Sequence, residues 1–421
     1  MHTAGLIDIT DLNRPVLSRG QERARAQAEA NPVALSVDAI LTAARAETGL
    51  DDFGAEDFVG RLQVMIEAID EDAEIHEMRR ADLLHMWSRF AKYRLRLEDL
   101  VKRHPEILQI EMRDPIIVTG LPRSGTTHLV SVLSADKRLR SLPWWEAIAP
   151  IPTDADSPTE VDSNPRWRRA QAGWELYDRL LPHMAAMHEF STDHISEDIE
   201  LQGLDFSSYL LEWLAYVPRW RDYYLSHDQT STYAYLRKVM QVLSFLSGPR
   251  RWVIKCPQHM EQLCVLRKTF PQGAFVLTHR DPVASIQSAI TATCYYDRLH
   301  RKSVNLPQRA NYWIDRYKKL LTRCVEQRSA LPASQSIDLY YDVWTKNPDG
   351  ALDEIYKCAG LSLTQETRQL LHQYVVDNPE GAHGKVVYNL RRDFGISAAE
   401  LRQEFRFYLD RFPAKAEVRL D

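Results

Sequence analysis

The chain has 421 residues, of which 44% are hydrophobic and 26% charged, and its formal net charge is −5. This length can bury a large core and hold two or three domains, while the slightly acidic balance argues against bulk binding of nucleic acid. No apolar segment reaches the length of a membrane span, and the N-terminus lacks an export-signal pattern, so we expect a cytoplasmic protein without integral membrane contact. Five cysteines without C-x-x-C spacing predict reduced thiols.

The first third of the chain reads as an N-terminal arm followed by helices. Residues 1–33 are polar and show no steady apolar period, which predicts a partly ordered arm that wraps the body. From residue 36 to about 108, apolar residues recur at helical spacing. We therefore predict an arm and helical cap over residues 1–110. An α/β domain then covers 111–421, with a helical insertion around 160–250.

A strand, a loop and a helix follow in quick succession over residues 115–129. A short apolar run ends at Gly120, and Gly-Leu-Pro-Arg-Ser-Gly-Thr-Thr leads into a helical pattern. Such a turn aims backbone N–H groups and a helix N-terminus at an anion. The stretch nearly matches the Walker A pattern G-x-x-x-x-G-K-S/T, but Thr126 stands where the lysine belongs. Arg123 is the nearest replacement cation, and its guanidinium suits phosphate-like oxygens.

Two side chains between residues 142 and 200 are candidates for proton transfer. Glu146 follows two tryptophans and precedes two prolines, so it is either a buried general base with a raised pKa or a residue that packs a turn. His188 opens a segment crowded with titratable residues, and it is either a catalytic residue or a solvated side chain. The histidine spacing does not match a metal motif.

Two further strand-loop-helix units occupy residues 251–291. Lys255 ends the first strand and Arg280 follows the second, while Ser288 lies about two turns into the next helix. Successive units of this kind imply a parallel sheet with right-handed crossovers. Since ligands bind at the carboxyl edge of such a sheet, Arg123, Lys255 and Arg280 should converge on one anionic ligand.

The last quarter of the chain contains another predicted strand and several helices. The strand covers residues 337–341, and helices are predicted over 307–328, 348–360, 364–376 and 398–411. A glycine-spaced basic loop, residues 380–385, reads as either a tether or a flap over the ligand.

Three motifs together resemble one enzyme family. Gly120–Thr127, Lys255–His259, and Thr278–Pro282 followed by Ser288 are similar to the PAPS-dependent sulfotransferases, in particular their bacterial and mycobacterial branch. A more distant similarity is to tyrosylprotein sulfotransferases. The resemblance runs from about residue 35 to about residue 395. It implies a P-loop-like α/β fold with parallel strands flanked by helices, and transfer of a sulfuryl group from 3′-phosphoadenosine 5′-phosphosulfate (PAPS) to a hydroxyl of a small molecule or lipid.

The resemblance also implies roles for individual residues. The loop residues Arg123, Ser124, Gly125, Thr126 and Thr127 would hold the 5′-phosphosulfate. The 3′-phosphate would lie on Arg280 and Ser288, while Lys255 would stabilise the bridging oxygen. Glu146 lies near the base of tyrosylprotein sulfotransferases, and His188 is the alternative because cytosolic sulfotransferases use a histidine. Tyr341 and Lys385 match cofactor-side positions, although the R-K-G stretch of cytosolic sulfotransferases is absent.

Two other functions remain open at this point. The loop is compatible with a P-loop kinase or nucleotide hydrolase, which the missing lysine disfavours, and with an inactive module that binds the product 3′-phosphoadenosine 5′-phosphate (PAP). Sulfuryl transfer needs positioning and charge stabilisation and no metal in this scheme. The acceptor and the oligomeric state are not determined by the sequence.

Overall fold

A sheet of five parallel strands forms the centre of the molecule, in the order β3-β4-β2-β5-β6. The computed structural model describes residues 5–112, 114–153, 156, 164–188, 191–379 and 383–419. The strands are β2 (Ile116–Gly120), β3 (Leu139–Arg140), β4 (Arg251–Lys255), β5 (Ala274–His279) and β6 (Ser336–Tyr340). The four predicted strands and the parallel α/β class are confirmed. The two-residue edge strand β3 was not predicted.

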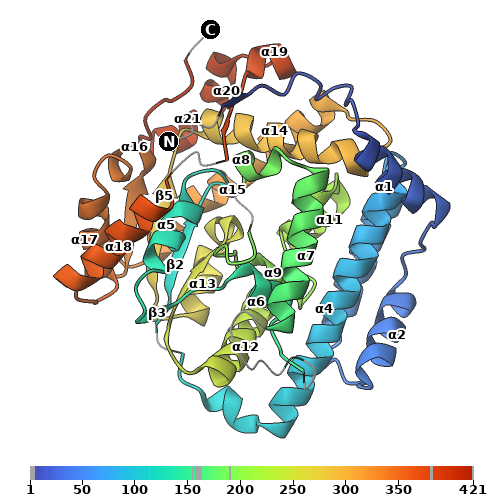
Figure 1. Ribbon diagram of the computed structural model, residues 1–421. Coiled ribbons are helices and arrows are strands. Elements are labelled where there is room, and N and C mark those ends of the chain that lie inside the picture. The colour runs from blue at the N-terminus through green and yellow to red at the C-terminus, as the bar shows by residue number, and fades with distance from the viewer. Residues whose placement is uncertain are drawn as a thin grey trace.

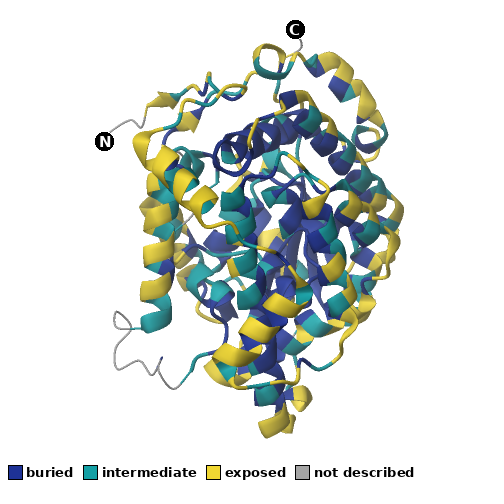
Figure 2. Cartoon of the chain, turned by 90° about the vertical axis from the view of Figure 1, so that its right-hand side faces the viewer, coloured by how far each residue is buried: buried dark blue, intermediate teal, exposed yellow. Residues whose placement is uncertain are grey.

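Helices cover both faces of this sheet. Ile116 and Val118 of β2 face one apolar core, and Ile117 between them faces the other, so the central strand is buried on both sides. The first face is covered by α5 (Thr126–Leu133), α17 (Pro348–Cys358) and α18 (Gln365–Asp377). The second is covered by α12 (Thr230–Ser247), α13 (Leu263–Thr269), α14 (Pro282–His300) and α15 (Leu306–Gln327). Figure 2 shows the buried residues gathered inside these layers.

The cap helices pack on the same core as the second face. Leu62, Leu83 and Trp87 are fully buried in the cluster that also contains Trp252 and Leu277 of the sheet. The helices of this part are α2 (Val37–Thr48), α3 (Asp57–Asp70), α4 (Glu77–Arg103) and the 3-10 turn η1 (Pro105–Gln109). The predicted helical character of residues 36–108 is therefore confirmed.

Short helices fill the connections between these layers. The insertion contributes α6 (Trp144–Ile148), α7 (Pro165–Leu180), α8 (Met184–Met187), α9 (Ile199–Gly203), α10 (Leu210–Leu214) and α11 (Pro218–Ser226). The α/β part adds η4 (Pro257–Glu261), η5 (Arg328–Ala330), α16 (Tyr341–Trp344) and α19 (Leu390–Phe394). Among the described residues, no helix is both long enough and apolar enough to cross a membrane.

The N-terminal arm contains a helix that the polar sequence did not suggest. In α1 (Arg19–Ala30), Ser18 caps the backbone N–H of Gln21, whose side chain in turn accepts from the backbone N–H of Ser18. Arg25 Nη1 donates to three carbonyls at the end of α14, those of Arg298, Leu299 and Arg301. The helix also packs against α4, where Glu29 Oε1 lies 2.7 Å from His76 Nε2, so it is held by polar contacts with two helices and has no apolar face of its own.

The first and the last described segments of the chain lie toward the same end of the molecule (Figures 1 and 2). The strand β1 (Leu6–Ile7) pairs in parallel with β7 (Lys385–Val386). Only part of the predicted flap over residues 380–385 can be placed, because 380–382 lie outside the described residues. The predicted helix over 398–411 is broken into α20 (Ala398–Glu404) and α21 (Arg406–Leu409).

Candidate functional site

Three cationic side chains meet where β4, β2 and β5 end. These strands are neighbours and run parallel, so their carboxyl-terminal loops emerge side by side. Arg280 Nη1 donates to the carbonyl oxygen of Arg123 at 2.5 Å, and Lys255 Nζ donates to Thr127 Oγ1 at 3.0 Å. Arg280 and Lys255 thus both contact the loop that carries Arg123, at the sheet edge where the sequence analysis expected the three cations.

The loop after β2 is held in a shape that requires glycine. A Cβ atom at Gly120 would lie 1.9 Å from Thr278 Oγ1, so only glycine lets β2 end against β5. Ser124 Oγ and Thr278 Oγ1 are 2.8 Å apart and hydrogen-bonded, which fixes the loop on the end of β5. Arg123 and Gly125 both have positive φ values, 68° and 83°. A positive φ is costly for arginine, and such strain is concentrated at ligand sites.

The helix that follows the loop begins without a side chain that caps its first backbone N–H groups. Gly125 is the N-cap of α5 and has no side chain to accept from the first N–H groups. Thr126 and Thr127 occupy the first two helical positions, and Thr126 is buried. Backbone donors, two hydroxyls and the positive end of the helix dipole thus share one small region, which is a suitable environment for an anion.

The guanidinium of Arg280 forms a bidentate ion pair with a carboxylate from the C-terminal segment. Its Nε and Nη2 donate to the two carboxylate oxygens of Glu417 at 2.7 and 2.6 Å. The C-terminal segment is fixed there because the carboxylate of Asp281 accepts from the backbone N–H of Glu417 at 2.8 Å. Tyr341 stacks on the other side of the arginine, with its ring centre 4.0 Å from Cζ. The two N–H groups of Arg280 that could bind a phosphate in a bidentate way are therefore bound to a carboxylate.

Ser288 connects the loop to the C-terminal part of the chain. Its hydroxyl accepts from Arg123 Nε at 3.1 Å and donates to Tyr388 Oη at 3.0 Å. Tyr317, on α15, donates from its hydroxyl to the carbonyl of Pro122 at 3.3 Å. Burial raises the pKa of Tyr317, while the nearby charges of Arg123 and Arg280 oppose the rise. Both arginines thus lie close to this neutral phenol.

Lys255 is enclosed by the segment that precedes α9. Only 1% of its side chain is exposed, and Nζ lies 2.5 Å from a carboxylate oxygen of Glu197. His194 is also buried here, and its pKa is lowered to about 3, first by burial and then by the charge of Lys255. His194 is therefore a neutral imidazole at physiological pH.

Glu146 lies beside this region but is fully engaged by an arginine. Arg140 Nη1 and Nη2 donate to its two carboxylate oxygens at 3.0 and 2.9 Å. The guanidinium of Arg140 in turn lies 4.1 Å from the ring centre of Trp252. Both members of the pair are buried, so the carboxylate is paired in a bidentate geometry within the core.

His188 and Lys385 lie on two neighbouring segments. His188 ends α8, and its ring centre is 5.8 Å from that of His194, which connects it to the surroundings of Lys255. Met187 and Val386 share a small apolar core, so β7 lies beside α8. Lys385 is exposed, and its backbone N–H donates to the carbonyl of Gly5, but its side chain makes no hydrogen bond or ion pair to the residues that the structure describes. Among the described residues, the Lys385 side chain thus makes no polar contact with the loop, Lys255 or Arg280.

Four residues of this neighbourhood were not singled out from the sequence: His194, Glu197, Tyr388 and Glu417. His194 and Glu197 belong to the segment that stood out for its titratable residues. The sequence does not show which of these residues contacts Lys255, so it could not favour these two over the others. Tyr388 and Glu417 carry no local pattern. Their contacts with Ser288 and Arg280 span 100 and 137 residues of sequence.

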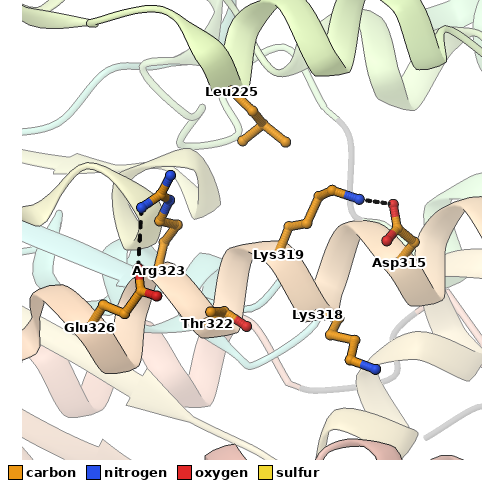
Figure 3. A pocket seen from close by; sticks show the side chains of 7 residues that line it. All are labelled: Leu225, Asp315, Lys318, Lys319, Thr322, Arg323 and Glu326. Atoms are coloured by element: carbon orange, nitrogen blue, oxygen red, sulfur yellow. Dashed lines mark hydrogen bonds and ion pairs between the residues drawn. The ribbon is translucent and has the colours of Figure 1, made fainter.

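A separate hollow lies on the outer face of α15 (Figure 3). It has a volume of about 420 Å³ and lies between α15 and Leu225 of α11. Its walls are charged and paired with each other, as Lys319 binds Asp315, and Arg323 donates to Glu326 at 3.2 Å. The side of α15 that faces the loop carries Tyr317 instead. This hollow is therefore distinct from the anion site and lacks the apolar walls that an acceptor pocket needs.

The cluster is suited to an anion with more than one charged group. Arg123, Lys255 and Arg280 are cationic, although Lys255 is paired with Glu197 and Arg280 with Glu417, and the start of α5 adds backbone donors. Over the described parts of the chain, no group of three or more histidine, cysteine, aspartate or glutamate residues is arranged to hold a metal ion. The arrangement can bind, orient and neutralise an extended anion.

Comparison with known proteins identifies relatives of this site and fold. A family model described as "Sulfotransferase family" matches residues 115–365, which include the loop, Lys255, Arg280 and Ser288. An omega-hydroxy-beta-dihydromenaquinone-9 sulfotransferase, Stf3, of Mycobacterium bovis and of Mycobacterium tuberculosis is 26% identical over 286 residues. That alignment covers 63% of this chain and 68% of each relative.

Solved structures extend the similarity to nearly the whole chain. Sulfotransferase STF1 of Mycobacterium tuberculosis H37Rv superposes with a TM-score of 0.77 at 26% identity, covering 88% of this chain and 98% of that one. Sulfotransferase STF9 of Mycobacterium avium gives a TM-score of 0.81 at 23% identity, covering 91% and 98%. The fold that this chain shares with these structures thus extends over about nine tenths of its length.

Proposed function

The chain belongs to the sulfotransferase family, and we propose that it transfers a sulfuryl group from PAPS to a hydroxyl of a small molecule or lipid. The observation that carries the choice of donor is the meeting of Arg123, Lys255 and Arg280 around one glycine-bounded loop. A donor with a 5′-phosphosulfate and a separate 3′-phosphate needs such an arrangement. ATP lacks the second, separate phosphate.

The residues present fit the two anionic ends of PAPS. The uncapped start of α5 offers backbone N–H groups to the phosphosulfate, together with the hydroxyls of Thr126 and Thr127. Arg280 already accommodates a carboxylate through two donors, so its fork can take two oxygens of a 3′-phosphate. Ser288 would donate to the same phosphate after releasing Tyr388.

The other loop residues take supporting roles in this proposal. Ser124 and Gly125 shape the loop, since the Ser124 hydroxyl is bound to Thr278 and Gly125 has a positive φ. Tyr341 packs beside Arg280 and would line the cofactor side. Lys385 stays a predicted cofactor contact, carried by the family resemblance alone.

Positive charge does most of the catalytic work in such a reaction. Sulfuryl transfer, like phosphoryl transfer, should pass through a loose, in-line transition state in which negative charge grows on the leaving oxygen. Lys255 and Arg123 would stabilise that charge, and they are held in place before the donor arrives. A base must also take the proton of the acceptor hydroxyl, and Glu146 and His188 are the two candidates from the sequence.

Two further observations bear on the acceptor and on the cellular setting. The relative Stf3 is named for a hydroxylated menaquinone derivative, which supports a lipid-like hydroxyl as the acceptor. All five cysteines are unpaired, which supports a reducing compartment and hence the cytoplasm.

Binding and turnover together test this function. Calorimetric titration with PAP should show binding in the wild type and a loss of at least about 30-fold in affinity in Arg280→Ala, because a charge-assisted bidentate contact is removed. Labelled PAPS should transfer its sulfur to a member of a panel of phenols and alcohols. Failure to bind PAP, or Mg²⁺-dependent turnover of ATP, would overturn the proposal. PAP binding without transfer to any acceptor would favour an inactive binding module.

A further inference from the structure

Glu197 is held beside Lys255 by backbone hydrogen bonds on both sides. The N–H of Ser196 donates to the carbonyl of Leu142 at 2.7 Å, and the N–H of Asp198 donates to the carbonyl of Lys255 at 3.2 Å. The carboxylate of Asp198 is itself 3.1 Å from His259 Nε2 in the core. Glu197 therefore occupies a defined position rather than the tip of a loose loop.

One oxygen of this carboxylate is bound and the other is available. Oε1 lies 2.5 Å from Lys255 Nζ, whereas Oε2 makes no hydrogen bond within the described parts of the chain. The Glu197 side chain is 17% exposed, while that of Lys255 is 1% exposed. The carboxylate is therefore the more exposed member of this pair, and a molecule that approaches from solvent can reach it.

Glu146 contrasts with this arrangement. Both of its oxygens accept hydrogen bonds from Arg140, and the pair is buried. Taking a proton there would leave the Arg140 guanidinium in the core without its counter-charge, which is costly. Of the two carboxylates, only Glu197 has an oxygen without a hydrogen-bond partner among the described residues.

From this geometry, and resting on the proposed function, we infer that Glu197 is the base that accepts the proton of the acceptor hydroxyl. The attacking and leaving oxygens lie in line on opposite sides of one sulfur atom. Two groups that touch each other, as Lys255 and Glu197 do, can therefore contact one oxygen each. Lys255 stabilises the leaving oxygen, and Glu197 receives the proton of the attacking one.

The step is balanced without any further reactant. The acceptor oxygen forms a bond to sulfur, and the bond between sulfur and the bridging oxygen of the phosphosulfate breaks with its electron pair on that oxygen. The acceptor proton moves to the carboxylate of Glu197. The products are the sulfate ester and PAP, and the proton then passes from Glu197 to solvent.

Glu197→Gln separates proton transfer from positioning. The amide oxygen can still accept a hydrogen bond from Lys255, but the amide cannot take a proton. The matched control is Glu200→Gln, three residues along the chain, because Glu200 pairs with Arg89 at 2.8 Å and does not contact Lys255. PAP affinity, measured by calorimetry, should not fall by more than about threefold in either variant because neither change removes a donor of the PAP site.

Acceptors of different acidity distinguish a base from a residue that only supports the structure. Loss of a base slows the reaction of a weakly acidic phenol more than that of an ionised one, whereas a structural defect slows both equally. With 4-methylphenol, the rate of PAP release from PAPS by Glu197→Gln should fall by at least about 100-fold. With 4-nitrophenol at about pH 8, where this phenol is largely ionised and needs no base, the fall should be below about tenfold. Glu197→Asp should recover part of the rate with 4-methylphenol, and Glu200→Gln should match the wild type.

The outcomes distinguish this inference from the proposed function. Wild-type rates in Glu197→Gln, or equal losses with both phenols, would overturn the role of Glu197 while the sulfotransferase activity stood. A wild-type protein that binds no PAP would overturn the proposed function and this inference with it.

Discussion

The buried imidazole of His194 should make the protein less stable in mild acid. Its pKa is lowered from 6.5 to about 3 because burial and then Lys255 disfavour the charged form. A lowered folded-state pKa gives stability that is complete above pH 6.5 and is lost as the pH falls toward about 3. At about pH 5 the unfolded chain has taken up this proton and the folded chain has not, which costs about 2 kcal/mol.

Replacing the ring removes this dependence. In His194→Gln, the difference in unfolding free energy between about pH 8 and about pH 5 should be smaller than in the wild type by about 2 kcal/mol. The measurement is urea unfolding followed by circular dichroism at both pH values. His227→Gln, at an exposed histidine, is the control. If His194→Gln keeps the full wild-type dependence, His194 is not a buried neutral imidazole and the described surroundings of Lys255 are wrong.

Three further changes test separate contacts. Gly120→Ala should abolish PAP binding, because a Cβ there would lie 1.9 Å from the Thr278 hydroxyl; wild-type affinity by calorimetry would contradict the described loop. Glu417→Gln should tighten PAP binding about fivefold, since releasing Arg280 from a partly exposed ion pair gains about 1 kcal/mol; unchanged or weaker binding would count against competition at this arginine. Asp338→Asn should lower the free energy of unfolding at neutral pH by at most about 2 kcal/mol, allowing for solvent screening. The pKa of Asp338 is lowered to about 2, so the wild type should lose this contribution as the pH falls from about 4 to about 2, which acid unfolding curves would reveal.

The sheet and its cationic edge could be predicted because their signals are local. Each central strand is a short apolar run with a cation at its end, as Lys255 in β4, or in the loop that follows it, as Arg123 after β2. Parallel pairing then requires these loops to meet, whatever the lengths of the segments between them. The convergence of Arg123, Lys255 and Arg280 followed from this rule alone.

The state of each carboxylate could not be predicted, because it depends on a partner. Glu146 forms an ion pair with Arg140, and Glu197 forms one with Lys255. Nothing in the spacing of these residues along the sequence shows which carboxylate is the better candidate for a base. Contacts between distant segments were equally hidden. Two-residue strands such as β1 and β7 have no periodicity to detect, and the hold of Glu417 on Arg280 joins the last residues of the chain to the end of β5.

The helix α1 was missed for a different reason. The pattern of Ser18 and Gln21 is a capping signal that was present in the sequence, but the following residues have no apolar face. The helix is stabilised instead by Arg25, which donates to the end of α14. Helical structure held by polar docking is invisible to a search for amphipathic periodicity.

A crystal structure with PAP bound tests the central claim most directly. We predict that the 3′-phosphate lies on Arg280 and Ser288, in place of the Glu417 carboxylate. The 5′-phosphate should lie within the loop of residues 123–127, close to Lys255. A nucleotide bound elsewhere, or a 3′-phosphate remote from Arg280 with Glu417 still in place, would contradict the account.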